Sequence, residues 1–350
     1  MFIVRRIARV PKTKTESARR QTRKAADGKP TLRTIAEAAN LAVTTVSRAL
    51  ADDPLISSTT RERVREIADR LGYMPDRAAQ RLKTGKTNVI GVLLDQHEEI
   101  LGFGTSLLYG VTKALKGTPY HLIVMPNFLD TSNVEAVEHI VRNNLADGII
   151  FTRTEVLDPR VRLLIEKDFP FVSHGRTEFT TPHPFVDYDN YAFAYEAAHR
   201  LVAKGRHKLT IILPPRHLTF SQHMLHGFMT AVREAGVAYE LAEGITLDST
   251  AGMVRDYFRT RLQRPDPPDA LICPGEVSAM AAITGLFDGG WALGREYDIV
   301  AKQTSRLLSD IQPGVDAIYE DLTAAGEHLG RLLLKRIDGA EVENLQVILT

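Results

Sequence analysis

Residues 31–73 read TLRTIAEAANLAVTTVSRALADDPLISSTTRERVREIADRLGY and predict three short helices. Thr31 can cap the first helix, in which apolar residues recur at helical spacing, and a tight connection at residues 40–41 separates it from the second. The third helix begins near Ser57 or Ser58 and ends at Gly72. Two short helices joined by a tight turn, with a third beside them, are typical of a helix-turn-helix unit.

The segment after this unit predicts a helix that cannot be stable alone. Asp76 can cap residues 77–83, and Thr84-Gly85-Lys86 ends the helix after about two turns. So short a helix needs an external partner. We therefore interpret residues 76–87 as a hinge helix and linker.

Charge is distributed unevenly along the chain, although the net charge is only +1. Residues 1–88 carry 20 lysines and arginines against 9 aspartates and glutamates, a balance of +11, whereas the other 262 residues balance to −10. This asymmetry predicts that the first quarter of the chain faces a polyanion. Residues 1–30 hold ten of the cations and predict a disordered basic arm, which either adds phosphate contacts or comes from a start site upstream of the native one.

Composition and length predict a soluble protein of two or three domains. The 350 residues are 44% hydrophobic and 25% charged, with no apolar run of about 18 residues that could span a membrane. The single cysteine, Cys273, excludes an internal disulfide and any multi-cysteine metal site. Because the first residues also lack the pattern of a secretory signal, we expect a cytoplasmic protein.

From residue 88 onward, apolar strand-like runs alternate with helical stretches. The runs at 89–94, 148–151 and 270–273 are examples, and amphipathic stretches such as 191–202 lie between them. This alternation predicts a parallel, doubly wound sheet, and its length favours two lobes. A ligand site is then expected at the carboxyl ends of the strands, between the lobes.

Several short sequence motifs occur in an order and spacing that are typical of one protein family. TIAEAA, TTVSRAL, TRERV, LGYMPDRAAQRL and IGVLL follow one another within residues 31–94 and resemble the amino-terminal region of the lactose-repressor (LacI/GalR) family. Weaker matches, such as PFVSHGR, DYDN and ALICPGE, continue to about residue 335. The resemblance implies a small all-α helix-turn-helix domain plus an α/β two-lobed periplasmic-binding-protein-like sensing domain.

The helical pattern and the resemblance together set the expected domain boundaries. The DNA-binding domain covers residues 31–75, the hinge 76–87, the ligand-binding and dimerisation domain 88–340, and a C-terminal tail 341–350. Lobe 1 is expected at about 88–188 and 320–340, and lobe 2 at about 189–319. Three crossings between the lobes are expected, near residue 189, near 288–291 or slightly later, and near 318.

The resemblance places the second helix of the DNA-binding unit in the major groove. Val43, Thr44 and Arg48 then face base edges, and Arg48 is the candidate for a bidentate contact with guanine. The residues expected to contact phosphates are Thr34, Thr45 and Ser47. Ala42 stands where the family usually has a capping serine, which should weaken the start of this helix by about 1 kcal/mol.

Four hinge residues receive roles from the resemblance. Leu82 is expected to enter the central base step from the minor groove and kink the duplex. Ala79 allows two hinge helices to pack closely, and Arg77 and Gln80 meet DNA or the opposite chain. A helix that forms only on DNA couples folding to binding.

The residues just past the predicted strand ends are candidates for the effector pocket. Asp95, Arg176 and Glu276 supply charged partners for hydroxyl groups, and Phe103 or Tyr319 can stack against a sugar ring. The remaining candidates are Gln96, His97, Arg153, His174, His223, Met224 and Gln303. The chain departs from the family at Met224, where an arginine is usual, and at residues 301–304, where Ala-Lys-Gln-Thr replaces the usual Gly-Tyr/Phe-Asp-Asp.

These features predict a ligand-responsive transcription regulator. The chain contains no GxGxxG, P-loop, HExxH or GxSxG motif, so we expect no catalytic residue, metal or cofactor. The expected partners are double-stranded operator DNA, a second copy of the chain and a small effector, with no membrane. The favoured hypothesis is a repressor released from a palindromic operator by a saccharide or glycoside. The alternatives are a corepressor-type regulator that senses a purine or other small metabolite, and a sugar-binding receptor without gene regulation.

Overall fold

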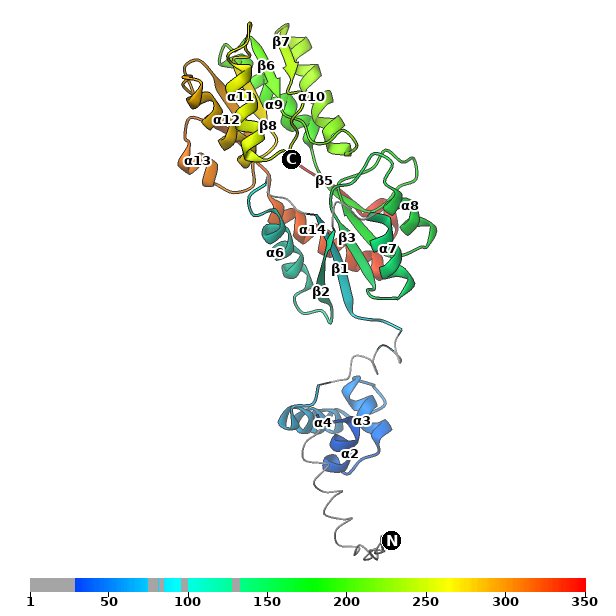
Figure 1. Ribbon diagram of the computed structural model, residues 1–350. Helices are drawn as coiled ribbons and strands as arrows, with labels where there is room; N and C mark the ends of the chain where they lie inside the picture. Colours follow the sequence, from blue (N-terminus) through cyan, green and yellow to red (C-terminus); the bar gives the residue numbers. More distant parts are fainter. Residues whose placement is uncertain (1–28, 75–80, 82–84, 96–99, 128–132) are drawn as a thin grey trace, which may run out of the picture. The chain divides into compact units, whose positions relative to one another are not determined.

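The computed structural model describes residues 29–74, 81, 85–95, 100–127 and 133–350. The chain divides into two compact units, Met1–Lys86 and Thr87–Thr350, which are coloured by position in the sequence in Figure 1. The predicted basic arm lies outside the described residues apart from its last two positions, 29 and 30. The predicted hinge residues Arg77, Ala79, Gln80 and Leu82 lie outside them as well.

The first unit is the predicted bundle of three helices, α2 (Leu32–Ala39), α3 (Val43–Leu50) and α4 (Ser58–Leu71). Thr31 caps α2 by accepting a hydrogen bond from the Thr34 amide, and Ser57 caps α4 in the same way. Asn40 ends α2 in a left-handed conformation with φ of 52°, which a short polar side chain tolerates. The apolar faces meet in one small core of Ile35, Ala36, Ala39, Val46, Ala49, Val64, Ile67 and Ala68.

The start of α3 has no side-chain cap, because Ala42 occupies the N-cap position in an extended conformation. A serine there could accept a hydrogen bond from the Thr44 or Thr45 amide. We expect Ala42→Ser to stabilise α3 by about 1 kcal/mol, which corresponds to roughly fivefold slower amide exchange in its first turn. Hydrogen exchange of the full-length protein measures this. The matched change Ala38→Ser, inside α2, should have the opposite effect because serine is a poorer helix former than alanine.

Lobe 1 of the second unit is a six-stranded parallel sheet in the order β11-β5-β4-β3-β1-β2. Helices α6 and α14 cover one face, and α7 and α8 cover the other (Figure 1). The strands are β1 (Val89–Asp95), β2 (His121–Asn127), β3 (Gly148–Phe151), β4 (Phe171–His174), β5 (Phe185–Tyr188) and β11 (Gln346–Leu349). The helices are α6 (Phe103–Leu115), α7 (Asn133–Arg142), α8 (Pro159–Glu166) and α14 (Leu322–Ile337).

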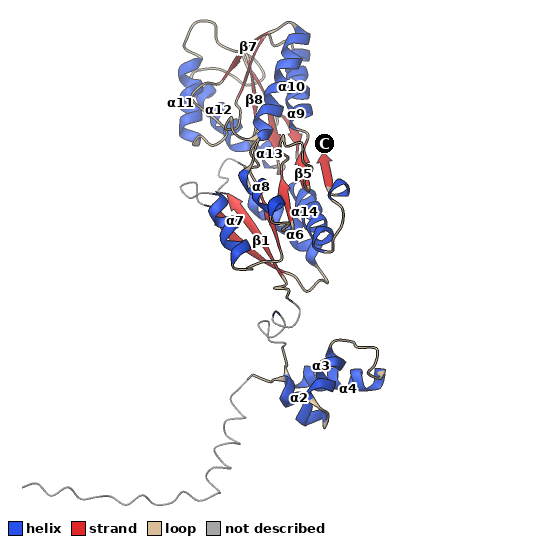
Figure 2. Ribbon diagram, turned by 90° about the vertical axis from the view of Figure 1, so that its right-hand side faces the viewer, coloured by secondary structure: helices blue, strands red, loops and turns tan. Residues whose placement is uncertain are grey.

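Lobe 2 is a five-stranded parallel sheet in the order β10-β9-β8-β6-β7. Helices α9 and α10 cover one face and α11 and α12 the other, so both sheets are doubly wound, as predicted (Figure 2). The strands are β6 (Lys208–Ile211), β7 (Ala238–Leu241), β8 (Ala270–Cys273), β9 (Asp298–Gln303) and β10 (Asp316–Tyr319). The helices are α9 (Asn190–Ala203), α10 (Thr219–Ala235), α11 (Ala251–Arg261), α12 (Glu276–Asp288) and α13 (Leu307–Ile311).

Two expectations about the chain path are wrong. The predicted tail at 341–350 instead contains the 3-10 turn η1 (Val342–Asn344) and β11, which pairs in parallel with β5 because buried Leu345 anchors it to the lobe 1 core. The predicted crossing near 288–291 does not occur, since α12 and β9 on either side of it both belong to lobe 2. The chain passes between the lobes after β5, near Asp189, and after β10, at Glu320.

Within the described residues, no helix has both the length and the apolar character needed to cross a membrane.

Candidate functional site: a DNA-reading helix and a pocket between the lobes

Helix α3 presents the predicted base-reading side chains on its open side. Val43, Thr44 and Arg48 are exposed, while Thr45 and Ser47 are partly covered by the bundle. Thr34 is exposed as well, in the first turn of α2, where its hydroxyl forms a 3.1 Å hydrogen bond with that of Thr31. An exposed valine, with 42% of its surface accessible, has no packing role in the unit and is available for apolar contact.

Arg48 has a fixed orientation. Its Nε donates a 2.8 Å hydrogen bond to Asp53 Oδ2, and Asp53 Oδ1 in turn accepts a 2.9 Å bond from the Leu55 amide. The Arg48 hydrogen bond holds the pKa of Asp53 below its usual range. Asp53 engages Nε and not the two terminal nitrogens of Arg48, which form the end of the guanidinium that can make a bidentate contact with guanine.

A pocket lies between the two lobes of the second unit. It encloses about 630 Å³ of space, including its opening to solvent. Both lobes and both crossing segments contribute to its wall. The lining residues are Ile100, Phe103, Arg153, Thr154, His174, Gly175, Arg176, Asp187, Tyr188, Asn190, Thr219, Phe220, Leu247, Pro274, Lys302 and Glu320.

Arg176 and Asp187 form an ion pair in the lobe 1 wall. Arg176 Nε lies 3.3 Å from Asp187 Oδ2, and Asp187 Oδ1 accepts a 2.9 Å hydrogen bond from the Tyr188 amide. Burial raises the pKa of Asp187 to about 6, although Arg176 opposes the shift. Asp187 is therefore an ionised but poorly solvated acceptor at neutral pH, suited to a ligand hydroxyl.

Lys302 projects from the end of β9 toward both crossing segments. Its Nζ donates a 2.6 Å hydrogen bond to Asn190 Oδ1 and lies 3.0 Å from Glu320 Oε2. The ammonium also lies 4.4 Å from the ring centre of Tyr188. Two polar partners and an aromatic face compensate for the burial of this charge.

Direct contacts bridge the lobes around the pocket. Arg153, at the end of β3, makes two hydrogen bonds of 2.9 and 2.5 Å to the carboxylate of Asp248 in lobe 2. The Thr219 amide donates a 3.1 Å bond to the Thr154 carbonyl, and Thr304 Oγ1 lies 3.0 Å from the Leu101 carbonyl. Any change in the angle between the lobes must rearrange these contacts.

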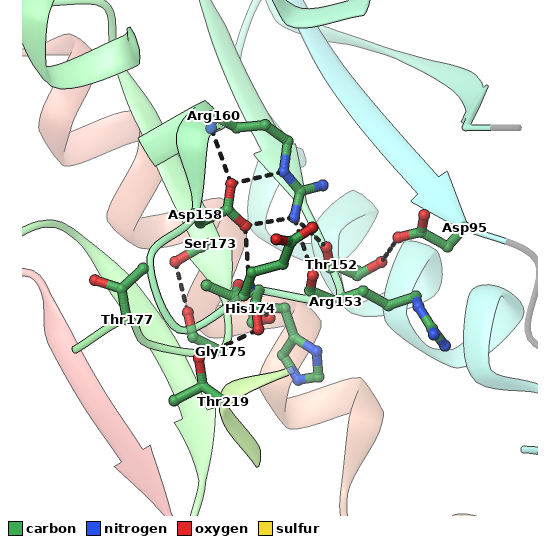
Figure 3. Close-up of polar contacts among 12 residues, drawn as sticks. Asp95, Thr152, Arg153, Asp158, Arg160, Ser173, His174, Gly175, Thr177 and Thr219 are labelled. Carbon is green, nitrogen blue, oxygen red and sulfur yellow. Dashed lines mark hydrogen bonds and ion pairs between the residues drawn. The ribbon is translucent and has the colours of Figure 1, made fainter. Parts of the chain in front are cut away.

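A buried ion pair supports the turn that carries Arg153 and Thr154. Asp158 and Arg160 are almost completely buried, and Arg160 Nη2 lies 2.7 Å from Asp158 Oδ2 (Figure 3). The same nitrogen donates to the carbonyls of Thr152 and Arg153, at 3.1 and 3.0 Å. Asp158 also caps α8, so this pair fixes the turn against both β3 and α8.

The structure brings four of the predicted pocket residues into the pocket wall: Phe103, Arg153, His174 and Arg176. His223 lies directly behind the wall, with Nδ1 3.5 Å from Arg176 and Nε2 3.2 Å from Glu178. Gln96 and His97 lie outside the described residues.

Five other predicted pocket residues do not line the pocket. Met224 is fully buried in the core beneath α9 and α10. Asp95 accepts a 2.9 Å hydrogen bond from Thr152 Oγ1. Glu276 is buried at the start of α12 and accepts hydrogen bonds from the Thr304 and Ser305 amides. Gln303 accepts a 2.7 Å hydrogen bond from Ser309 Oγ, and Tyr319 is half exposed.

The polar residues of the pocket wall that were not predicted from the sequence are Thr154, Asp187, Asn190, Thr219, Lys302 and Glu320. Asp187 lies in β5, a four-residue strand that the sequence did not reveal, although the motif DYDN marked its position. Lys302 and Glu320 are each one position from a predicted residue, Gln303 and Tyr319. Side chains alternate along a strand, so an error of one residue selects the wrong face.

Among the described residues, no group of three or more histidines, cysteines, aspartates or glutamates is arranged to hold a metal ion.

Comparisons with known protein families match nearly the whole chain. The model of bacterial regulatory proteins of the lacI family matches residues 31–76. The model of periplasmic binding proteins and the sugar binding domain of the LacI family matches residues 87–333.

Curated relatives match over most of their length. The HTH-type transcriptional regulator AglR of Rhizobium meliloti (strain 1021) is 32% identical over 314 residues, which are 87% of this chain and 86% of that protein. The HTH-type transcriptional regulator CelR of Thermobifida fusca is 25% identical over 92% of this chain and 96% of that protein.

Solved structures share the fold. The lac repressor dimer bound to operator and the anti-inducer ONPF has a TM-score of 0.77 at 20% identity, covering 92% of this chain and 96% of that chain. The complex of the transcriptional regulator CelR with cellobiose has a TM-score of 0.66 at 23% identity, covering 91% and 97%. The predicted fold class is confirmed.

Proposed function

Because the chain belongs to the LacI family of bacterial regulatory proteins, we propose that it is a repressor released from its operator by a saccharide or glycoside. The observation that carries the proposal is the pocket between the lobes, which combines charged hydrogen-bonding groups with Phe103, Tyr188 and Phe220. Charged partners for hydroxyls beside aromatic faces suit a sugar ring. The relative CelR, whose complex contains cellobiose, supports a saccharide effector.

The DNA contacts are part of this proposal. Val43, Thr44 and Arg48 read base edges in the major groove, and Thr34, Thr45 and Ser47 contact phosphates. In the hinge, Leu82 wedges into the minor groove, Ala79 lets two hinge helices pack closely, and Arg77 and Gln80 contact DNA or the opposite chain. Effector binding changes the angle between the lobes and melts the hinge helices. The coupling must be reciprocal, so operator DNA must also weaken effector binding.

The experiment selects duplexes from a random pool with the full-length protein and measures operator affinity by fluorescence anisotropy, with and without saccharides. We expect a near-palindromic site and a five- to 150-fold loss of affinity at saturating effector, for a coupling of about 1–3 kcal/mol. A saccharide that strengthened operator binding would make the protein a corepressor-type regulator. Failure to prefer any palindrome over random duplex at moderate salt would refute the proposal.

We propose that the regulator is a homodimer. Each chain supplies one DNA-reading helix, so binding to a palindromic operator requires two chains related by two-fold symmetry. The lac repressor whose fold this chain shares is described as a dimer. Exposed apolar side chains lie on α6, β2, α12 and α13, and Figure 1 shows α6, α12 and α13 on one side of the unit, opposite α7 and α8. They include Tyr109, Ile123, Val124, Phe287, Leu307 and Ile311.

We expect Phe287→Glu to weaken this dimer. Phe287 is 79% exposed, so the change leaves the fold intact but places a charge where apolar contact is proposed. Sedimentation velocity should show the dimer dissociating at protein concentrations at least tenfold higher than for the wild type, since 1.4 kcal/mol corresponds to about tenfold in affinity. Leu157→Glu, an equally polar change at a 58% exposed leucine beside α8, should leave the dimer unchanged.

Effector affinity should decrease as the pH falls through 6. Asp187 has a pKa of about 6, so it is ionised at pH 7.5 and mostly protonated at pH 5.5, where it no longer accepts a hydrogen bond from a ligand hydroxyl at both oxygens. The dissociation constant measured by calorimetry should rise by up to about fourfold between these pH values. Asp187→Asn should bind more weakly at pH 7.5 and lose this pH dependence. If effector affinity in Asp187→Asn depends on pH as it does in the wild type, the titrating group is another one, such as His223.

A further inference from the structure

Every lysine and arginine of the pocket wall is paired with a carboxylate. Arg153 pairs with Asp248 through two hydrogen bonds, Arg176 pairs with Asp187 at 3.3 Å, and Lys302 pairs with Glu320 at 3.0 Å. Asp187 and Glu320 belong to the wall themselves. Asp248, which pairs with Arg153, is in lobe 2 outside the lining, so the three cations are matched by two carboxylates of the wall and one beside it.

The Lys302–Glu320 pair is the least accessible to solvent of the three. The side chains of Lys302 and Glu320 are 6% and 10% exposed. The ammonium contacts Glu320 and Asn190 and lies over the rings of Tyr188 and Phe193, the last 5.0 Å away. Lys302 thus has no unused capacity for an anion, and a ligand that recruited it would have to displace the Glu320 carboxylate.

This arrangement discriminates between ligands by charge. A phosphate or carboxylate group entering the pocket would meet Asp187 and Glu320 at close range, and partial removal of one cation would leave a buried charge unpaired. An uncharged hydroxyl can donate to a carboxylate and accept from a cation without separating the pair.

We propose that the pocket selects an uncharged saccharide and rejects phosphorylated or acidic sugars, with Lys302 and Glu320 as the specificity-determining pair. The inference rests on the proposed function, since it specifies which saccharides the same pocket accepts.

The experiment compares neutral and phosphorylated sugars on the full-length protein. Cellobiose, maltose and glucose are tested against their 6-phosphates by thermal shift and by release of operator DNA. The test variant is Glu320→Gln, which keeps the shape of the side chain and leaves Lys302 uncompensated. The double variant Glu320→Gln/Lys302→Gln restores neutrality, and Glu196→Gln removes an exposed carboxylate from α9, away from the pocket.

In the wild type, we expect a neutral sugar to bind at least about tenfold more tightly than its phosphate. In Glu320→Gln the ratio should shift toward the phosphate by at least about tenfold, in line with the strength of charge-assisted hydrogen bonds. The double variant should lose this gain, and Glu196→Gln should behave as the wild type. If Glu320→Gln fails to fold, Asp187→Asn, which releases Arg176, should show the same shift.

The outcomes separate this inference from the proposed function. A phosphorylated sugar that binds the wild type as tightly as its neutral parent and releases the operator would overturn the inference and leave the saccharide-responsive repressor standing. An unchanged ratio in both Glu320→Gln and Asp187→Asn would also overturn it. If no sugar of either kind stabilises the protein or releases the operator, the proposed function falls, and the inference falls with it.

Discussion

Replacing Arg160 with methionine should lower the free energy of unfolding of the second unit by about 3–5 kcal/mol, because the change leaves the Asp158 carboxylate buried without its partner. The side chains of Arg160 and Asp158 are 1% and 0% exposed. Arg160 also packs over the ring of Phe151, with its guanidinium carbon 4.4 Å from the ring centre. Methionine can fill much of this space but supplies none of the hydrogen bonds.

The same change should weaken effector binding. Arg160 donates to the carbonyls of Thr152 and Arg153, and Arg153 has a left-handed backbone with φ of 55°. That conformation is costly for a residue with a side chain and persists only when its surroundings hold it. Without Arg160 the turn loses its support, so Arg153 no longer points reliably at Asp248 across the pocket.

Urea unfolding of the full-length protein measures the stability change. The double variant Arg160→Met/Asp158→Asn should recover part of the loss, since it removes the unpaired charge as well. Arg336→Met provides the matched control: Arg336 pairs with the 87% exposed Asp168 at 2.6 Å, and the loss of so exposed a pair should cost less than about 1 kcal/mol. If Arg160→Met and Arg336→Met lower the free energy of unfolding equally, the buried pair contributes no more to stability than the exposed pair.

This pair also illustrates what the sequence does not reveal. Asp158 followed by Pro159 is a readable start signal for α8. Burial of Arg160 is not readable, because arginine is almost never fully buried unless it is paired. Its environment depends on Phe151 and the end of β3, and their position beside α8 is a property of the tertiary fold.

The two units differ in how much could be predicted. In the DNA-binding unit the three helices, the cap at Thr31 and the start of the third helix near Ser57 or Ser58 were predicted, because helical periodicity and capping are local properties. In the pocket the decisive residues lie in or just after strands of four to six residues, β5, β9 and β10. The periodic pattern does not fix which of two adjacent residues at a strand end faces the pocket, and a shift of one position exchanged Lys302 for Gln303 and Glu320 for Tyr319.

The largest functional effect is expected at Arg48. Arg48→Ala should weaken binding to the selected operator by about 1–3 kcal/mol, roughly 5- to 150-fold, because a bidentate contact with guanine is lost. Binding to random duplex should change much less, since that affinity depends on phosphate neutralisation by many cations. Fluorescence anisotropy on both duplexes at one fixed salt concentration measures the two effects. Equal losses on both would mean that Arg48 contacts only the backbone.

Asp53→Asn tests whether Arg48 must be oriented by Asp53 to contact a base or contributes only its positive charge. The variant removes a negative charge from the DNA-binding unit, so electrostatics alone predicts tighter binding to every duplex. The geometry predicts the opposite for the operator, because asparagine holds Arg48 Nε less firmly than the carboxylate that now lies 2.8 Å away. We expect affinity for random duplex to rise slightly while affinity for the operator falls several-fold. A parallel rise on both duplexes would show that Asp53 does not orient Arg48 and that the ion pair is a feature of the free protein alone.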